Sequence, residues 1–330
     1  MRNYKWGILG PGGIANKFAD SLAVLPNAIL YAVGSRDINR ARAFAEKHHF
    51  EKAYGSYEAL ANDRDVDIIY VATRHPQHEE AVLTCLNSGK PVLCEKPFAV
   101  NARQASRMIE NARKNNIFLM EAMWTRFLPS ICKTRELISN GAIGNVLHIG
   151  VDFGFRADVD PNSRLFAQNS AGGSLLDVGV YNVSFCSMIM GKQPDRVQSH
   201  LNIGGTGVDE SASMLFNYSE GQSAQLISSI RMTTPHEAAI YGEEGYIKLP
   251  AYWCGKTVVL NNKDGAREMV FPFEDAAGFQ FEALEAMSCL DKGLLESPDM
   301  PLDETLAVMQ TLDRIRFDNH LRYCFEEAGS

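Results

Sequence analysis

Short apolar runs alternate with amphipathic segments along the first 120 residues of the chain. The runs have the length of buried strands and read KWGIL, ILYAVG, DIIYVA, PVLCE and IFLMEA. The segments between them carry apolar residues at helical spacing, over 13–25, 38–49, 77–89 and 102–115. Strands that alternate with helices of this length predict βαβ units and a doubly wound parallel sheet.

From about residue 145 the pattern changes to successive strands. The run NVLHIGVDFGFR precedes a helical segment at 172–190. Alternating runs separated by turn signals follow at 195–203, 210–218, 223–232, 237–242, 245–250, 256–261 and 266–273, and helical patterns close the chain at 275–293 and 302–324. We therefore predict an α/β protein with a Rossmann domain at 1–121. An α+β domain with a large, mostly antiparallel open sheet should follow at 122–330. Its C-terminal helix is expected either to stay with this domain or to pack back on the first one.

Composition narrows the classes of partner. The formal net charge of −8 argues against nucleic acid or an anionic membrane surface, because both require a basic face. The seven cysteines form no C-x-x-C pair, which favours a reducing compartment and gives no sign of a zinc site. No apolar run reaches the roughly 18 residues of a membrane span. We expect a soluble, cytoplasmic protein without a metal.

A glycine-rich turn stands between the first strand and the first helix. The stretch GPGGIA places Gly10, Gly12 and Ala15 in the spacing of a dinucleotide-binding turn, with Gly13 and Ile14 in the same turn. The helix N-terminus offers N–H groups and a positive dipole to a pyrophosphate. An FAD site or a methyltransferase would use a similar turn and is the alternative at this point.

The tip of the second strand bears on the choice of dinucleotide. It reads Ser35-Arg36-Asp37, a hydroxyl and a guanidinium that suit the 2′-phosphate of NADP. Asp37 precedes a helical segment and is interpreted as its N-cap. NADP is therefore favoured over NAD. Arg36 as a solvated surface charge is the competing interpretation.

Two further strands end in polar residues. One runs into TRHPQH, with Thr73 and His78, and the other into Glu95-Lys96-Pro97. Ligands of open α/β sheets bind outside the carboxyl ends of the strands, so these residues should lie beside the nicotinamide half of the cofactor. His78 as a helix-capping residue is the competing interpretation.

A second group of polar residues lies downstream in GGSLLDVGVYNVSF. Asp177 and Tyr181 are four residues apart in a helical segment and share one face. A tyrosine is a poor acid–base catalyst unless a cation stabilises its phenolate, which Lys96 would do if the two converge. A buried, purely structural Asp–Tyr hydrogen bond is the alternative.

Taken together, these motifs resemble the Gfo/Idh/MocA oxidoreductase family. The stretches that carry the resemblance are GILGPGGIA, TRHPQH, LCEKPFAVN, EAMWTRFLP, GGSLLDVGVY, YGEEGYIKL and the terminal ESPDMPLDETLAVMQTLDRIR. They are similar to the branch of dimeric dihydrodiol dehydrogenases and NADP-dependent D-xylose dehydrogenases, over nearly the whole chain. The resemblance implies hydride transfer between nicotinamide C4 and a carbinol carbon of a sugar, polyol or vicinal diol. It also implies a homodimer through the second sheet.

The resemblance implies a role for each matching residue. Glu95 would touch the nicotinamide ribose, and Lys96 would contact substrate and cofactor. Asp177 would bind or polarise the substrate, and Tyr181 would donate or accept the proton. Trp124 and Arg126 would line the substrate pocket or contact the cofactor. A non-catalytic NAD(P)-binding sensor on the same scaffold is the alternative function.

Overall fold

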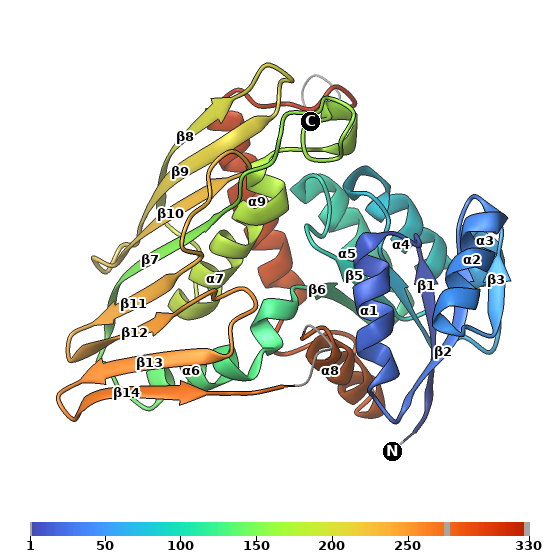
Figure 1. The fold of residues 1–330 in the computed structure, drawn as a ribbon, viewed down its shortest axis with the longest axis horizontal. Coiled ribbons are helices and arrows are strands. Elements are labelled where there is room, and N and C mark those ends of the chain that lie inside the picture. Colours follow the sequence, from blue (N-terminus) through green and yellow to red (C-terminus); the bar gives the residue numbers. More distant parts are fainter. Residues whose placement is uncertain (1, 274–277, 327–330) are drawn as a thin grey trace. The chain divides into compact units, whose positions relative to one another are not determined.

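A computed structural model describes residues 2–273 and 278–326 of the chain. Contacts divide the chain into two compact units (Figure 1). Unit 1 comprises Met1–Trp124 and Phe273–Leu306, and unit 2 comprises Thr125–Pro272 and Ala307–Ser330. Residues 278–306 were predicted to belong to the second domain. They group with unit 1, and one contact that joins them to it is the hydrogen bond from the Leu119 N–H to the Leu295 carbonyl oxygen at 3.1 Å.

Unit 1 is built on a six-stranded parallel sheet of order β3-β2-β1-β4-β5-β6. Its strands are β1 (Tyr4–Leu9), β2 (Ala28–Gly34), β3 (Lys52–Tyr54), β4 (Ile68–Val71), β5 (Val92–Glu95) and β6 (Leu119–Ala122). Strands β4, β5 and β6 are buried along their whole length, as expected of a parallel sheet with helices on both faces. The strand order reverses between β1 and β4, which confirms the doubly wound prediction.

Unit 1 contains the helices α1 (Gly13–Ala23), α2 (Ile38–His48), α3 (Tyr57–Ala61), α4 (His78–Asn87), α5 (Ala102–Asn115) and α8 (Gln280–Asp291). Three of these described helices, α2, α3 and α5, begin at a capping side chain. The Asn101 side chain accepts the Gln104 N–H at 3.0 Å and so caps α5. The sequence analysis missed β3 and α3, because three and five residues contain too few periods to register a pattern.

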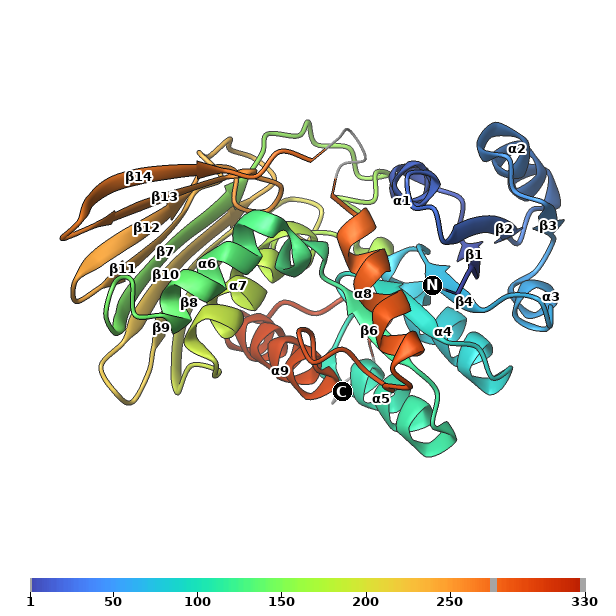
Figure 2. The same cartoon turned by 90° about the horizontal axis from the view of Figure 1, so that it is seen from below.

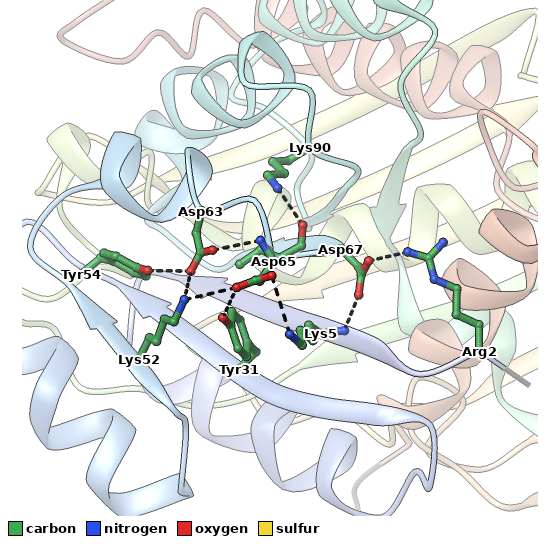
Figure 3. A network of polar contacts seen from close by, with 10 residues as sticks. Arg2, Lys5, Tyr31, Lys52, Tyr54, Asp63, Asp65, Asp67 and Lys90 are labelled. Carbon is green, nitrogen blue, oxygen red and sulfur yellow. Dashed lines mark hydrogen bonds and ion pairs between the residues drawn. The ribbon is translucent and has the colours of Figure 1, made fainter.

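A network of polar side chains holds the loop that leads into β4 (Figure 3). Asp63 Oδ2 accepts hydrogen bonds from the Tyr54 hydroxyl at 2.6 Å and from Lys52 Nζ at 2.9 Å. Asp67 accepts the backbone N–H of Lys5 at 2.8 Å. The network therefore ties the loop to β3 and to β1.

Unit 2 is built on an eight-stranded sheet of order β14-β13-β12-β11-β7-β10-β9-β8. The strands are β7 (Val146–Gly154), β8 (Arg196–Ile203), β9 (Asp209–Asn217), β10 (Ser223–Ser229), β11 (Ala238–Gly242), β12 (Gly245–Leu249), β13 (Thr257–Asn262) and β14 (Gly265–Val270). All neighbours pair antiparallel except β7 and β10, which pair parallel. The predicted large, mostly antiparallel sheet is confirmed.

Helices cover one face of this sheet (Figure 2). The helical elements are α6 (Pro129–Ser139), a π-helical turn η4 (Leu175–Gly179), α7 (Val180–Met190) and α9 (Leu302–Asp318), which begins in unit 1. Short 3-10 turns lie at His75–Gln77, Trp124–Phe127 and Gln168–Ser170. Helix α6 was not predicted from the sequence. The segment 172–190 was predicted as a single helical segment, whereas in the structure a π-helical turn precedes α7. Of the predicted helix 275–293, residues 275–277 lie outside the described residues.

The stretch Gln168–Met190 passes a length and composition test for a membrane span, with a mean hydropathy of 1.2. It is the one such stretch among residues 2–273 and 278–326, and 83% of its apolar window is buried inside the protein. Burial of this kind is typical of a core helix. The stretch is therefore weak evidence for a membrane span.

Candidate functional site

The glycine-rich turn lies between β1 and α1. Gly10 has a φ of +88°, and a Cβ there would lie 2.8 Å from the Ala72 carbonyl oxygen, so this position requires glycine. Gly12 caps α1 in an extended conformation. Ala15 is fully buried where the helix packs on the sheet.

This turn fits the pyrophosphate of a dinucleotide. A Cβ at Gly13 would meet no atom within 4 Å, and one at Gly12 would meet only the Gly10 carbonyl oxygen at 3.8 Å. Ile14 follows in the first turn of α1, where N–H groups lack intrahelical partners. This turn carries no acidic side chain that would repel a phosphate. The shape and the charge therefore both suit an anion held by backbone N–H groups.

The tip of β2 presents one buried and one exposed polar side chain. Ser35 is buried, and its Oγ accepts the Asp37 N–H at 3.2 Å. Arg36 is exposed. Asp37 accepts the Asn39 N–H at 2.9 Å and caps α2, which confirms its interpretation as an N-cap. The guanidinium of Arg36 is thus an accessible positive charge at this strand end, next to the exposed carboxylate of Asp37.

A buried histidine joins the segments that follow β4 and β5. The ring nitrogens of His78 lie 3.0 Å from the Pro97 carbonyl oxygen and 3.1 Å from that of Thr73. Burial lowers the pKa of His78 below 6.5, so the ring is neutral at pH 7 and donates through one nitrogen. His78 therefore donates to one of these two carbonyls and contacts the other, and its predicted contact with a cofactor stays a prediction.

Glu95 and Lys96 lie at the carboxyl end of β5. The Tyr70 hydroxyl donates to one carboxylate oxygen of Glu95, and the Lys96 N–H donates to the other at 3.1 Å. Glu95 is buried, whereas Lys96 is half-buried at the first position beyond the strand, before a cis bond to Pro97. An acidic and a basic side chain thus stand at the sheet edge where a ligand of this fold binds.

A second buried acid in unit 1 was missed by the sequence analysis. Glu282, in the first turn of α8, is fully buried. Among the described residues, neither of its carboxyl oxygens has a hydrogen-bond partner. Burial, and then the negative charge of Glu95, raise its pKa well above 4.5 and so favour its protonated form. No local signal marks it, because it lies about 190 positions from Glu95 in an ordinary amphipathic helix.

The predicted pocket-lining residues Trp124 and Arg126 fall in different units. Trp124 is buried in unit 1 and stacks on Phe279, with ring centroids 4.3 Å apart. Arg126 is buried in unit 2, one residue after Thr125, whose hydroxyl donates to the Trp253 carbonyl at 2.9 Å. Both side chains are therefore buried rather than exposed on the surface.

The π-helical turn η4 carries Asp177. Its carboxylate is buried and accepts a hydrogen bond from Arg164 Nη1 at 2.7 Å. Arg164 itself is largely exposed, at 56% for its side chain. The pair therefore presents one held carboxylate and one accessible cation in unit 2. Arg164 was missed, because it stands in a loop without periodicity.

Tyr181 lies in the first turn of α7 and is 6% exposed. Its ring packs against Phe153, with centroids 5.5 Å apart. Phe153 in turn stacks on Trp253 at 4.8 Å and packs against His236 at 4.9 Å. The phenol is therefore part of an aromatic cluster, whose members other than Tyr181 the sequence analysis did not identify.

The structure brings the predicted residues together in two groups. The glycine turn, the β2 tip, the segments after β4 and β5, and Trp124 belong to unit 1, whereas Asp177, Tyr181 and Arg126 belong to unit 2. The convergence of Lys96 with Tyr181 stays a prediction. Among residues 2–273 and 278–326, no group of three or more His, Cys, Asp or Glu side chains is placed to hold a metal ion.

Comparison with known proteins identifies the class. Residues 4–123 match the oxidoreductase family with an NAD-binding Rossmann fold, and residues 131–248 match the GFO/IDH/MocA C-terminal domain. Unit 1 thus contains an NAD-binding domain, and the chain is an NAD(P)-dependent oxidoreductase. The chain belongs to the GFO/IDH/MocA family, as its resemblance implied.

Curated relatives match nearly the whole chain. It is 42% identical over 320 residues to a trans-1,2-dihydrobenzene-1,2-diol dehydrogenase of Xenopus tropicalis, which covers 94% of this chain and 96% of the relative. Identity to the human enzyme of that name is 38% over 323 residues, with the same coverage.

Solved structures share the fold. A levoglucosan dehydrogenase in complex with NADH and L-sorbose has a TM-score of 0.89 at 18% identity, covering 97% of each chain. A 3-ketoreductase from Actinomadura kijaniata in complex with NADP and TDP-benzene has a TM-score of 0.83 at 23% identity, covering 96% of this chain and 98% of that one.

Proposed function

We propose that this protein is an NADP-dependent dehydrogenase that oxidises a vicinal diol or a sugar, with trans-dihydrodiols and D-xylose as the substrates to test first. The observation that carries the proposal is the match to trans-1,2-dihydrobenzene-1,2-diol dehydrogenases over 94% of the chain at up to 42% identity. The same chain holds Lys96 at a strand end of the NAD-binding domain and an acid–phenol pair, Asp177 and Tyr181, on one helical run.

The proposed mechanism assigns one task to each residue. The glycine turn and Glu95 would hold NADP, whose nicotinamide would accept the hydride from the substrate. Asp177, kept in place by Arg164, accepts a hydrogen bond from a substrate hydroxyl. Tyr181 takes the proton of the reacting hydroxyl on its phenolate oxygen, and the ammonium of Lys96 stabilises that phenolate. Such acid–base assistance is worth about 10²–10⁴-fold in rate.

The aromatic cluster beside Tyr181 supports a substrate with an apolar ring. Phe153 and Trp253 stack 4.8 Å apart within this cluster, and aromatic surfaces favour a flat apolar partner. The adjacent Asp177–Arg164 pair supplies polar groups for hydroxyls. A cyclic diol combines both chemistries in one molecule.

The test of the mechanism is a pair of variants. Lys96→Met and Tyr181→Phe should each lower kcat by about 10²–10⁴-fold and leave NADPH binding within about twofold, measured by fluorescence titration. Two matched control variants should have near-normal rates. Lys192→Met removes a lysine that forms a surface ion pair, and Tyr218→Phe removes the hydroxyl of a buried tyrosine in unit 2. Near-normal turnover in either test variant would refute its role.

The cofactor preference rests on Arg36. Arg36→Ala should lower kcat/KM for NADP⁺ by about 10–100-fold and leave that for NAD⁺ unchanged, because one charge-assisted bond to the 2′-phosphate is lost. The exposed Arg42 on α2 gives the control variant Arg42→Ala. An equal loss with both cofactors would contradict this assignment.

A non-catalytic NAD(P)-binding sensor was the alternative, and the comparisons give it no support. It would bind NADPH but give no change of absorbance at 340 nm with any member of a panel of vicinal diols and aldoses.

We further propose that the protein is a cytoplasmic homodimer, joined through the sheet face of unit 2 that α6 and α7 leave uncovered. That outer face carries a row of paired aromatic side chains, His148, Tyr241 and Tyr246, with Tyr241 41% exposed. Tyr241→Glu should produce monomers in sedimentation equilibrium, whereas Phe317→Glu on α9 should not. Dimers in both variants would exclude this face.

Seven free cysteines are consistent with a reducing compartment, and cell fractionation tests the location.

A further inference from the structure

A buried carboxylate stands at the start of the helical run that carries Asp177 and Tyr181. Asp209, the first residue of β9, is completely buried. Its Oδ2 accepts the hydroxyl of Ser174 at 2.7 Å and the backbone N–H of Leu175 at 2.7 Å. Leu175 is the first residue of η4, so the carboxylate satisfies one of the N–H groups that a helix start leaves without an intrahelical partner.

The chain is shaped around this carboxylate. Gly173 has a φ of +117°, and a Cβ there would lie 2.1 Å from Asp209 Oδ1, so any other residue would displace the acid. The Tyr323 hydroxyl donates to the Gly172 carbonyl at 2.8 Å and holds the preceding residue of the loop. Ser228 on β10 lies 3.2 Å from the Ser174 hydroxyl and completes the enclosure.

The charge of this acid matters to the helix. Hydrogen bonds to an ionised acceptor are roughly twice as strong as neutral ones. A negative charge at a helix N-terminus is also stabilised by the helix dipole. Because η4 continues directly into α7, the end of the run fixed by Asp209 is the end that carries Asp177 and, four residues later, Tyr181.

We propose that Asp209 is a positioning residue that must be ionised to hold η4, and with it Asp177 and Tyr181, in the geometry for turnover. This inference rests on the proposed function, because it assumes that Asp177 and Tyr181 act on the substrate.

Burial raises the pKa of Asp209 from 3.8 to about 7, despite the hydrogen bonds from Ser174 and Leu175. Tyr323, from the C-terminal segment, is the ionisable group that packs against Asp209. Burial, and then the charge of Asp209, raise the pKa of Tyr323 well above 10, so its phenol stays neutral. Beyond Tyr323 lies Arg316, 5.1 Å from its ring. Arg316 is paired with Asp313 and Glu326.

Two ion pairs involve acids on the elements that Asp209 joins. On η4, Asp177 pairs with Arg164 at 2.7 Å. The next residue of β9, Glu210, pairs with Arg231 at 3.5 Å. Asp209 is therefore the group in this enclosure that changes charge near neutral pH.

The sign of the stability effect distinguishes positioning from ordinary structural support. A folded-state pKa above 3.8 means that ionised Asp209 costs stability, a cost absent below the unfolded value and complete above about pH 7. Asp209→Asn removes that charge. The melting temperature of the variant relative to wild type should therefore rise between pH 5.5 and pH 8.5, while its activity falls.

The experiment compares wild type, Asp209→Asn and Ser174→Ala as full-length proteins. With trans-1,2-dihydrobenzene-1,2-diol and NADP⁺, Asp209→Asn should lose roughly 10–100-fold in kcat/KM, because small misplacements of catalytic groups are costly. It should also lose the limb of the pH profile near pH 7, which Ser174→Ala retains. NADPH binding should be unchanged in both.

A second readout uses no substrate or cofactor. The hydrogen bonds from Ser174 and Leu175 lower the pKa of Asp209 relative to an opened η4 in which the acid is still buried, so ionisation favours the closed turn over that local opening although it costs global stability. Hydrogen–deuterium exchange of peptides spanning 173–182, corrected for intrinsic rates, should therefore show stronger protection at pH 8.5 than at pH 5.5 in wild type. Protection in Asp209→Asn should be weak at both. The α5 peptide, capped by the neutral Asn101, is the internal control.

Wild-type kcat/KM with an unchanged pH profile in Asp209→Asn would overturn the proposal. So would a melting temperature lowered equally at both pH values, with activity restored on cooling. If wild type turns over no diol or sugar, the proposed function fails, and the exchange data still decide whether Asp209 holds η4 in a charge-dependent manner.

Discussion

The carboxylate of Asp63 offers a quantitative test of what holds unit 1 together. Asp63 is 7% exposed at its side chain and accepts hydrogen bonds from Tyr54, Lys52 and the Asp65 N–H. Burial alone would raise its pKa, but these hydrogen bonds outweigh burial and lower it from 3.8 to about 2. The change to make is Asp63→Asn, which removes the charge and keeps the volume.

The magnitude follows from proton linkage. A shift from 3.8 to about 2 corresponds to about 2 kcal/mol of stability, at about 1.4 kcal/mol per pKa unit. Because the folded-state pKa is lowered, this stability is present in full above about pH 5, is roughly halved near pH 3, and vanishes as the pH falls through 2. Asp63→Asn should therefore lower the free energy of unfolding by about 2 kcal/mol at pH 7 and by less at pH 3.

The assay is urea unfolding of both proteins at pH 7 and at pH 3, with the midpoint and slope fitted separately. The control is Asp65→Asn, whose carboxylate accepts from Tyr31 at 2.9 Å but is 59% exposed. An exposed pair of this kind contributes at most about 1 kcal/mol. Equal losses in the two variants, or a loss in Asp63→Asn that does not shrink at pH 3, would refute the reasoning.

Two further predictions concern unit 1. Gly10→Ala should raise the dissociation constant for NADPH at least about tenfold, because a Cβ meets the Ala72 carbonyl at 2.8 Å on a backbone with φ of +88°; fluorescence titration measures it. Gly205→Ala, where a Cβ meets nothing within 4 Å, should bind normally. The melting temperature of Glu282→Gln relative to that of wild type should rise as the pH increases from 5 to 9. Wild type loses stability over this range because its buried acid, whose pKa is raised above 4.5, resists ionisation. A difference that does not vary with pH would contradict a raised pKa.

Much of the fold was accessible from pattern alone. The runs in DIIYVA and PVLCE became β4 and β5, and the helical segment 102–115 became α5 with the same bounds. Helix α5 is recognisable because it spans several helical periods and begins at a capping residue, and β4 and β5 are recognisable as continuous apolar runs bounded by turn residues. The short elements β3 and α3 have neither a continuous apolar run nor several periods.

Residues of the candidate site were likewise predictable only where a local pattern marks them. Gly10, Ser35, Glu95 and Lys96 stand at strand ends, where local sequence and the rule for α/β sheets place a ligand together. Arg164 could not be found in this way, since its partner Asp177 is 13 residues away and most of the segment between them has neither helical nor strand periodicity.

What the sequence determined by itself was the class of protein: a dinucleotide turn in a βαβ unit, a second domain of strands, and the polar residues at their ends. These are local properties, set by side-chain periodicity and by the few residues that permit a tight turn. Only the tertiary structure decided which buried acids lie near which groups. Glu282 meets the charge of Glu95 from a distant helix, and Asp209 reaches the start of η4 from another strand. Burial and electrostatic contact depend on distance in space, which no local pattern along the chain records.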